Sequence, residues 1–184
     1  MKKRSQIEEK YKWDLTKFCK NDEDFYKRLR KLDKEVSKIS AFEGHLAESD
    51  EKLFDCLELN EKFGKEHGFL YIYANLRLKT DNADEKANEM CEKINSFTTK
   101  YATLTSYIEV EVSAFSDEKL KALQKDSKFK NYKRYFEAIL RDKKHILSKQ
   151  EEVLLSKLSE FMNGFSDNFD KFSDVDLKFG EIED

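Results

Sequence analysis

The sequence predicts an all-α fold, an antiparallel bundle of long helices that ends in one short strand. Its 184 residues contain no proline, although average usage would give roughly nine, and proline breaks helices. Apolar residues recur at spacings of three and four along most of the chain, as in helices with one buried face. Residues 175–179 instead alternate apolar and charged side chains, which is the period of a half-buried strand.

The first helix is predicted from its cap and its stripe. Asn21 or Asp22 can accept hydrogen bonds from the free N–H groups at the helix start, and the acidic residues of the first turn offset the positive end of the helix dipole. Gly44 marks the turn that follows. The stripe consists of Phe25, Leu29, Leu32, Val36 and Ile39.

The second helix begins at the Ser49 cap, and its stripe runs from Leu53 to Leu78. Gly64 and Gly68 interrupt it, and each costs about 1 kcal/mol relative to alanine inside a helix. Because they are four residues apart, they lie on one face. Two interpretations stay open: close helix contact or a hinge, and a kink or a break between two helices.

The third helix is predicted from Ala83 to Val112, where the spacing of three and four holds for about eight turns. Its last part, Ile108–Val112, also alternates like a strand, but the longer pattern favours helix. Such a stripe resembles a coiled-coil seam, which an antiparallel helix pair can bury.

Shorter elements follow. Ser116 caps one short helix, and aromatic residues between 129 and 140 mark another. Ser148–Glu151 is a capping box that opens a helix, which Gly164 can end. A short aromatic segment precedes the strand Val175–Phe179. One strand cannot form a sheet, so we expect residues 1–184 to be a single helical N-terminal lobe of a longer protein.

Composition excludes several classes of protein. The net charge of -3 with 40% charged residues argues against a nucleic-acid binder, which needs a basic excess. A helix that spans a membrane needs a run of about 18 apolar residues, and the sequence contains no such run. The basic N-terminus is not followed by the apolar segment of a secretory signal. The three cysteines, Cys19, Cys56 and Cys91, form no paired motif, which favours reduced thiols in the cytoplasm. For Cys56 and Cys91 we expect places in the core.

A zinc peptidase motif is not found in the sequence. Histidines four residues apart on a helix, as in H-E-x-x-H, can hold one zinc ion, but His45, His67 and His145 are far apart in sequence. We expect His67 to be a hydrogen-bonded core histidine and His45 to be exposed. No catalytic and no metal-binding residue is therefore predicted in this chain.

Three residues are candidates for contacts in a groove or between lobes. Tyr71 and Tyr73 could line a groove, but they flank Ile72, so only one of them can face the core squarely. His145, in Lys143-Lys144-His145, could bind a substrate carboxylate. The pattern favours the alternative, a solvated basic helix end where cations offset the dipole.

Five short blocks carry a family resemblance. Their order and spacing, from about Trp13 to Phe179, resemble the N-terminal region of the oligoendopeptidase F family, zinc peptidases similar to thimet oligopeptidase. Lys144 stands where the family often has proline, and Asn82 where it often has threonine. The blocks are Tyr11–Thr16, Phe42–Leu46, Leu70–Leu76, Arg141–Leu155 and Asp174–Phe179.

The resemblance implies a function for the parent protein. The full enzyme would hydrolyse short peptides in the cytoplasm, with zinc held by two histidines and a later glutamate, and with the H-E-x-x-H glutamate as general base. Those groups would lie in a missing C-terminal catalytic domain, so zinc is expected there and not in this chain. The N-terminal lobe would help to wall a deep channel that admits oligopeptide substrates.

A stand-alone helical interaction module is the alternative. The stripe from Ala87 to Val112 could pair with a partner helix, and Val175–Phe179 could add to a partner's sheet. A self-contained enzyme ranks third, because paired catalytic groups are not found in the sequence.

Overall fold

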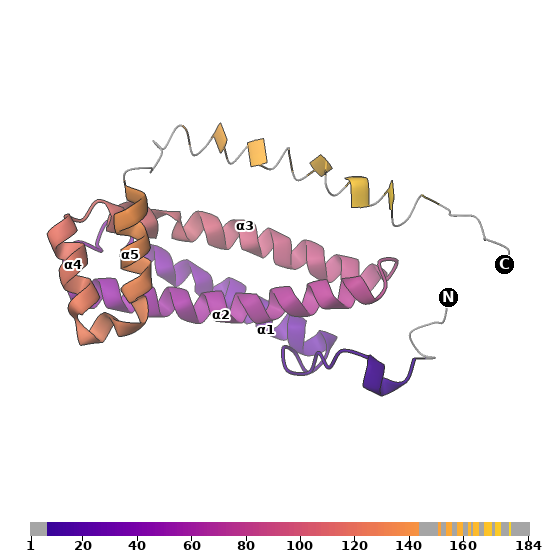
Figure 1. The fold of residues 1–184 in the computed structure, drawn as a ribbon. Coiled ribbons are helices and arrows are strands. Elements are labelled where there is room, and N and C mark those ends of the chain that lie inside the picture. The colour runs from indigo at the N-terminus through magenta and orange to yellow at the C-terminus, as the bar shows by residue number, and fades with distance from the viewer. Residues whose placement is uncertain are drawn as a thin grey trace. The chain divides into compact units, whose positions relative to one another are not determined.

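The computed structural model describes residues 7–143 and, beyond them, residues 151, 154–155, 158–159, 162, 164–165, 168–170, 172–173 and 177. The chain divides into two compact units, Met1–Leu140 and Arg141–Asp184. The described part contains helices and no strand (Figure 1).

Three long helices form the body of the first unit. They are α1 (Asp22–Glu35), α2 (Asp50–Thr80) and α3 (Glu85–Ser113). A four-residue turn joins α2 and α3 into an antiparallel hairpin (Figure 1). α1 also runs antiparallel to α2, because its start contacts the end of α2 at Arg77 and its middle contacts Glu66.

Side-chain caps fix the helix starts. The Asn21 side chain accepts from the Asp24 N–H at 2.9 Å, and Ser49 accepts from the Lys52 N–H at 3.1 Å. Ser116 caps α4 (Asp117–Lys125) in the same way. Each of these three sites satisfies an N–H group that a helix leaves free, and the caps predicted at Asn21, Ser49 and Ser116 are confirmed.

The segment between α1 and α2 is tied to the end of α3. After a short helical stretch, η3 (Val36–Phe42), the backbone turns at Gly44, whose φ of 80° favours glycine. The Glu111 carboxylate accepts from the Gly44 N–H at 2.5 Å and from the Leu46 N–H at 3.2 Å. The Tyr107 hydroxyl donates to the Ile39 carbonyl at 2.6 Å.

The far end of the hairpin is covered by α4, η4 (Ser127–Tyr132) and the first part of α5 (Lys133–Asp142). Phe129 packs edge-on against Phe54 of α2, with ring centroids 5.5 Å apart. Lys128 pairs with Glu51 at 3.1 Å. A short turn, η2 (Glu9–Tyr11), lies near the N-terminus.

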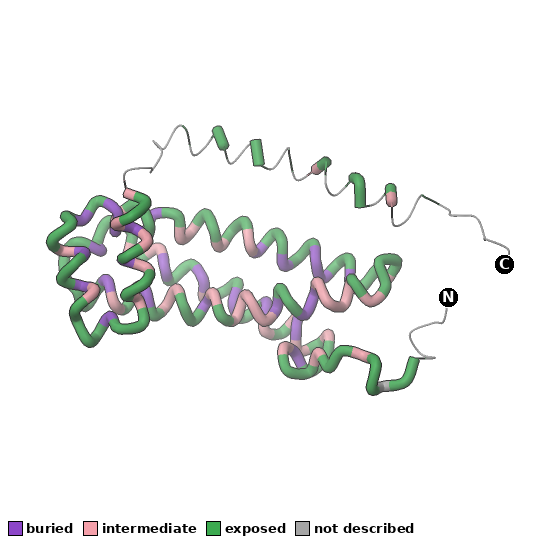
Figure 2. The backbone as a smooth tube through the Cα atoms, in the orientation of Figure 1, coloured by how far each residue is buried: buried purple, intermediate pink, exposed green. Residues whose placement is uncertain are grey.

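The core lies between these helices, and buried residues recur along α1, α2 and α3 (Figure 2). All three cysteines are buried and free, so the predicted core places of Cys56 and Cys91 are confirmed. The α3 stripe is buried too. The surface that a stand-alone module would offer to a partner helix is therefore already covered. Its buried members include Ala87, Met90, Ile94, Phe97, Ile108 and Val112.

The two glycines of α2 do not break the helix, which is continuous from Asp50 to Thr80. A Cβ at Gly64 would stand 3.3 Å from the Tyr101 hydroxyl, whereas a Cβ at Gly68 would meet nothing within 4 Å. The Tyr101 hydroxyl donates to Asn60 Oδ1 at 2.6 Å. The interpretation as a break is therefore wrong, and close helix contact is correct for Gly64.

α3 is helical through Ile108–Val112, so the prediction of helix there is confirmed and the strand alternative is wrong. The helix predicted to end at Gly164 continues, because Gly164, Phe165 and residues 168–170 are helical. Among the described glycines only Gly44 has positive φ, so Gly164 does not adopt the left-handed conformation of a helix-ending glycine.

The strand predicted at Val175–Phe179 is not observed at its one described residue. The Leu177 N–H donates to the Phe172 carbonyl at 2.9 Å, so this group bonds back to its own segment rather than to a neighbouring strand. The other four residues of the segment lie outside the described part, as do Ser148 and His145.

Replacing each glycine by alanine separates helix propensity from packing. Gly68→Ala should raise the free energy of unfolding by about 0.5–1 kcal/mol, because alanine favours the helix and the site is open. Gly64→Ala should gain none of this, because the Tyr101 hydroxyl must move away from Asn60. Urea unfolding followed by circular dichroism measures both, and equal stabilisation by the two variants would contradict the close contact.

Candidate functional site

Tyr73 faces the interior of the first unit. Its side chain is buried, its ring stacks on Phe25 with centroids 6.1 Å apart, and its hydroxyl donates to Asp22 Oδ1 at 2.6 Å. Burial, reinforced by the neighbouring Asp22 carboxylate, raises the pKa of Tyr73 above its ordinary value. The hydroxyl therefore stays protonated and donates at neutral pH.

Asp22 joins Tyr73 to a wider polar network. Its second oxygen, Oδ2, accepts from Arg77 Nη2 at 3.0 Å, and the same nitrogen lies 3.4 Å from Asp84 Oδ2. Asp22 opens α1 and Asp84 caps α3, so the starts of both helices are linked to the end of α2. Arg77 Nε is buried without a hydrogen-bond partner.

A cavity of about 510 Å³ lies beside this network, between the N-terminal segment and the end of α2. Its lining includes the half-exposed indole of Trp13, the cation of Lys20 and the buried thiol of Cys19. Burial raises the pKa of Cys19 to about 11, although nearby Arg28 opposes this shift. The thiol therefore stays protonated at neutral pH and is not an activated nucleophile.

Tyr71 belongs to the surface. It is 41% exposed, and its ring centroid lies 5.9 Å from that of His67. The prediction that only one of the two tyrosines faces the core is confirmed: Tyr73 faces inward and Tyr71 outward. Whether Tyr71, Tyr73 or His145 contacts a substrate or another lobe stays a prediction, and His145 lies outside the described residues.

His67 is a hydrogen-bonded histidine, as predicted. Its Nε2 lies 2.7 Å from Thr98 Oγ1, whose single proton is donated to the Ile94 carbonyl at 2.8 Å. Thr98 therefore accepts, which assigns the imidazole proton to Nε2. Burial lowers the pKa of His67 from its ordinary value of 6.5, so the neutral form is favoured.

The described residues do not form a zinc site. No group of three or more histidine, cysteine, aspartate or glutamate residues in this part of the chain could hold a metal ion. His67 is bonded to Thr98, and exposed His45 contacts the Glu48 carboxylate. Hydrogen bonds from Lys52 and then His45 lower the pKa of Glu48 to about 2, which is the behaviour of a surface ion pair.

Sequence reasoning missed Arg77 and gave Asp22 only a capping role. Arg77 follows Tyr73 by four residues, so both side chains lie on one face of α2. That spacing was the available signal, but the partner Asp22 is 55 residues away in sequence. Nothing local pairs the two groups.

None of the described helices is long and apolar enough to cross a bilayer.

Comparisons with known proteins find similarity to oligopeptidases of the F type. The family model described as Oligopeptidase F matches residues 111–179. The chain is 32% identical over 179 residues to the plasmid-encoded oligoendopeptidase F of Lactococcus lactis subsp. cremoris, covering 96% of this chain and 30% of that protein. It is 28% identical over 183 residues to oligopeptidase PepF of Bacillus subtilis, covering 98% of this chain and 27% of that protein.

A solved structure has the same fold. The crystal structure of oligoendopeptidase-F from Enterococcus faecium superposes with a TM-score of 0.76 at 23% identity, over 89% of this chain and 32% of that chain. The chain thus spans less than a third of the length of the curated relatives it matches.

A matched pair of tyrosine variants tests the inward and outward assignment. Tyr73→Phe should lower the free energy of unfolding by about 1–2 kcal/mol, because Asp22 loses a charged hydrogen bond in a partly buried setting. Tyr71→Phe should change it by less than about 0.5 kcal/mol, as expected at an exposed site. Both are measured by urea unfolding, and an equal loss in the two variants would contradict the assignment.

The His67 environment predicts a pH dependence. The unfolded chain takes up a proton near pH 6.5, whereas the folded chain takes it up only at lower pH. The contribution of His67 to stability is therefore complete above about pH 6.5 and is lost as the pH falls below it. His67→Gln should flatten the change in the unfolding midpoint between about pH 7.5 and 5.5. An unchanged slope would refute this role.

Proposed function

The chain belongs to the oligoendopeptidase F family, and we propose that it forms the N-terminal lobe of a zinc-dependent oligoendopeptidase that hydrolyses short peptides. The observation that carries this proposal is the extent of the match. Nearly all of this chain aligns with relatives of which it covers 27% and 30%. The catalytic groups would then come from sequence outside these 184 residues.

The lobe would contribute no metal ligand. Among the described histidines, His67 is hydrogen-bonded to Thr98 and His45 to Glu48. The described residues contain no cluster of side chains that could hold a metal ion. A zinc ion held by the catalytic domain would activate a water molecule for attack on the peptide bond. The role left for this chain is positioning and exclusion rather than chemistry.

A wall of the substrate channel is the role that the fold supports best. Packed helices with a continuous core form a stiff surface, and α2 and α3 are long and tightly joined. Exposed Tyr71 and Ile72 offer apolar and hydrogen-bonding contacts to a flexible peptide. His145 would be a basic contact for a substrate carboxylate, whereas buried Tyr73 would act by holding α1 in place.

Residues 1–184 would act as one lobe, working in the cytoplasm beside the C-terminal catalytic domain. A stand-alone interaction module is the second candidate. Its helix-pairing surface on α3 is buried, and the feature that favours it is the set of exposed apolar side chains between residues 154 and 177.

The direct test assays the 184-residue chain for bound zinc and for cleavage of a quenched fluorescent peptide. We expect neither stoichiometric zinc nor metal-dependent cleavage, because the described part of the chain offers no ligand cluster. Stoichiometric zinc together with cleavage that a chelator abolishes would overturn the proposal that the lobe is catalytically empty.

A chimera provides the positive arm. In it, this chain replaces the matched region of the Lactococcus oligoendopeptidase F. Cleavage of short peptides by the chimera would support the lobe assignment, provided that the Lactococcus protein without its matched region is inactive. A chimera that folds, binds zinc and cleaves nothing would count against it.

A further inference from the structure

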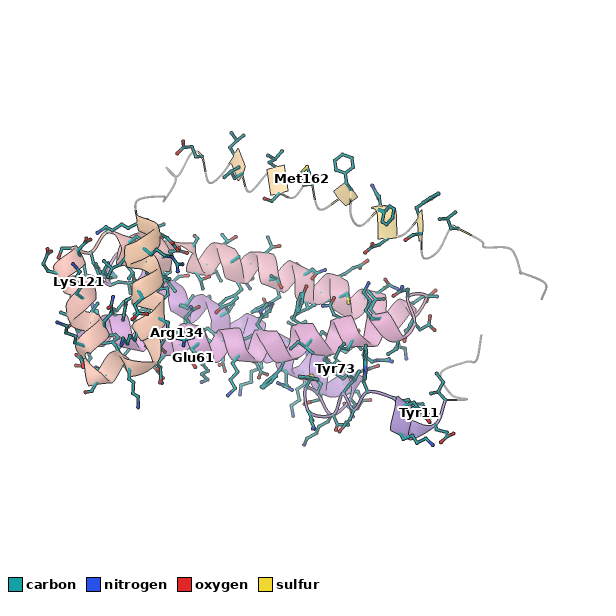
Figure 3. All side chains as sticks on the ribbon, viewed as in Figure 1. Tyr11, Glu61, Tyr73, Lys121, Arg134 and Met162 are labelled. Atoms are coloured by element: carbon teal, nitrogen blue, oxygen red, sulfur yellow. The ribbon has the colours of Figure 1, made fainter. Side chains whose placement is uncertain are left out.

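A row of large apolar side chains is exposed to solvent in the second unit. Seven of them lie between residues 154 and 172, and each is between 47% and 68% exposed. The described residues of this stretch are largely exposed (Figure 2), and Met162 is among them (Figure 3). The seven are Leu154, Leu155, Leu158, Met162, Phe165, Phe169 and Phe172. Together these seven side chains form the apolar row.

The apolar row lies on one side of a helix. Its members recur at spacings of three and four, and the described residues from 151 to 170 are helical. Six of them, from Leu155 to Phe172, alternate steps of three and four and form one seam, which Leu154 widens at its start. Such a seam can pack into a groove of a globular protein or against one partner helix, so the partner is argued from the charge of the segment.

The charge of this segment restricts its partner. Residues 151–184 contain ten acidic and three basic side chains. A surface that receives the apolar row would therefore have an apolar floor and a basic rim, since opposite charges favour association. A second copy of this chain would bring a second acidic segment, and like charges would oppose the pairing.

Relatives supply the candidate that fits this description. The chain covers 30% of the Lactococcus oligoendopeptidase F and 32% of the Enterococcus structure with the same fold. More than two thirds of such a peptidase is therefore available to cover the row. Contiguous exposed apolar surface of this kind marks an interaction site in soluble proteins.

We propose that the apolar row is the surface through which this lobe docks onto the catalytic part of the peptidase, in a groove with an apolar floor and a basic rim. The identity of the partner rests on the function proposed above. The chemistry of the surface does not, because it follows from the exposed side chains and the charge of the segment.

The test uses the 184-residue chain and two designed helical peptides of about 21 residues, three heptads each. One peptide has a leucine face and lysine flanks, and the other has the same face with glutamate flanks. The chain should be monomeric in sedimentation, and it should bind the lysine peptide one to one and the glutamate peptide about tenfold more weakly or worse.

Variants locate the binding surface. Phe165→Ser and Leu158→Ser should each weaken binding of the lysine peptide by about tenfold, because each removes a large apolar contact. The control is Val110→Ser on α3, which removes an exposed apolar side chain outside the apolar row and should leave binding unchanged. Urea unfolding of the variant chains should match that of the unaltered chain.

Four results would overturn the proposal. They are a dimer that Phe165→Ser dissociates, a loss of the chain's own stability in Phe165→Ser and Leu158→Ser, equal binding of both peptides, and no binding of either. The first would assign the row to a second copy and the second to the chain's own core. If the peptides behave as expected while the peptidase chimera cleaves nothing, the surface stands and the proposed function fails.

Discussion

The antiparallel contact between α2 and α3 is the interaction on which the other elements depend. α1 packs on α2, the η3 segment is bonded to the end of α3, and α4 with η4 covers the far end of the pair. Burial of the facing apolar stripes supplies most of the stabilising free energy in such a contact. Gly64 leaves room for the Tyr101 side chain of α3, whose hydroxyl lies 3.3 Å from where a Cβ at Gly64 would stand.

Polar contacts specify how α1 and its following segment lie on this pair. At the start of α1, the Asp22 carboxylate accepts hydrogen bonds from Tyr73 and Arg77. After the end of α1, the Glu111 carboxylate accepts hydrogen bonds from two backbone N–H groups of the turn at Gly44. Partly buried ion pairs add little net stability, since desolvation offsets the attraction. We expect their effect here to be on the register of α1, whose first residue, Asp22, lines the cavity beside Tyr73.

Local signals predicted most of the helices, and distant contacts were beyond them. Asn21, Ser49 and Ser116 act within three residues of their partners, so a short window of sequence reveals them. The split between Tyr71 and Tyr73 also follows from helical spacing. The Asp22–Arg77 pair joins two elements, and no local pattern encodes it. The helix end predicted at Gly164 was wrong because glycine permits a helix to end without requiring it.

The first unit is a scaffold of packed helices, the described residues hold no metal cluster, and the described part of the second unit exposes the apolar row. Amide hydrogen exchange on the isolated chain and on the same chain inside the peptidase chimera tests this account most directly. In both, α2 and α3 should exchange most slowly. Residues 154–172 should exchange quickly in the isolated chain and become protected in the chimera, because docking covers the row. Equal exchange of that segment in the two proteins would contradict the account.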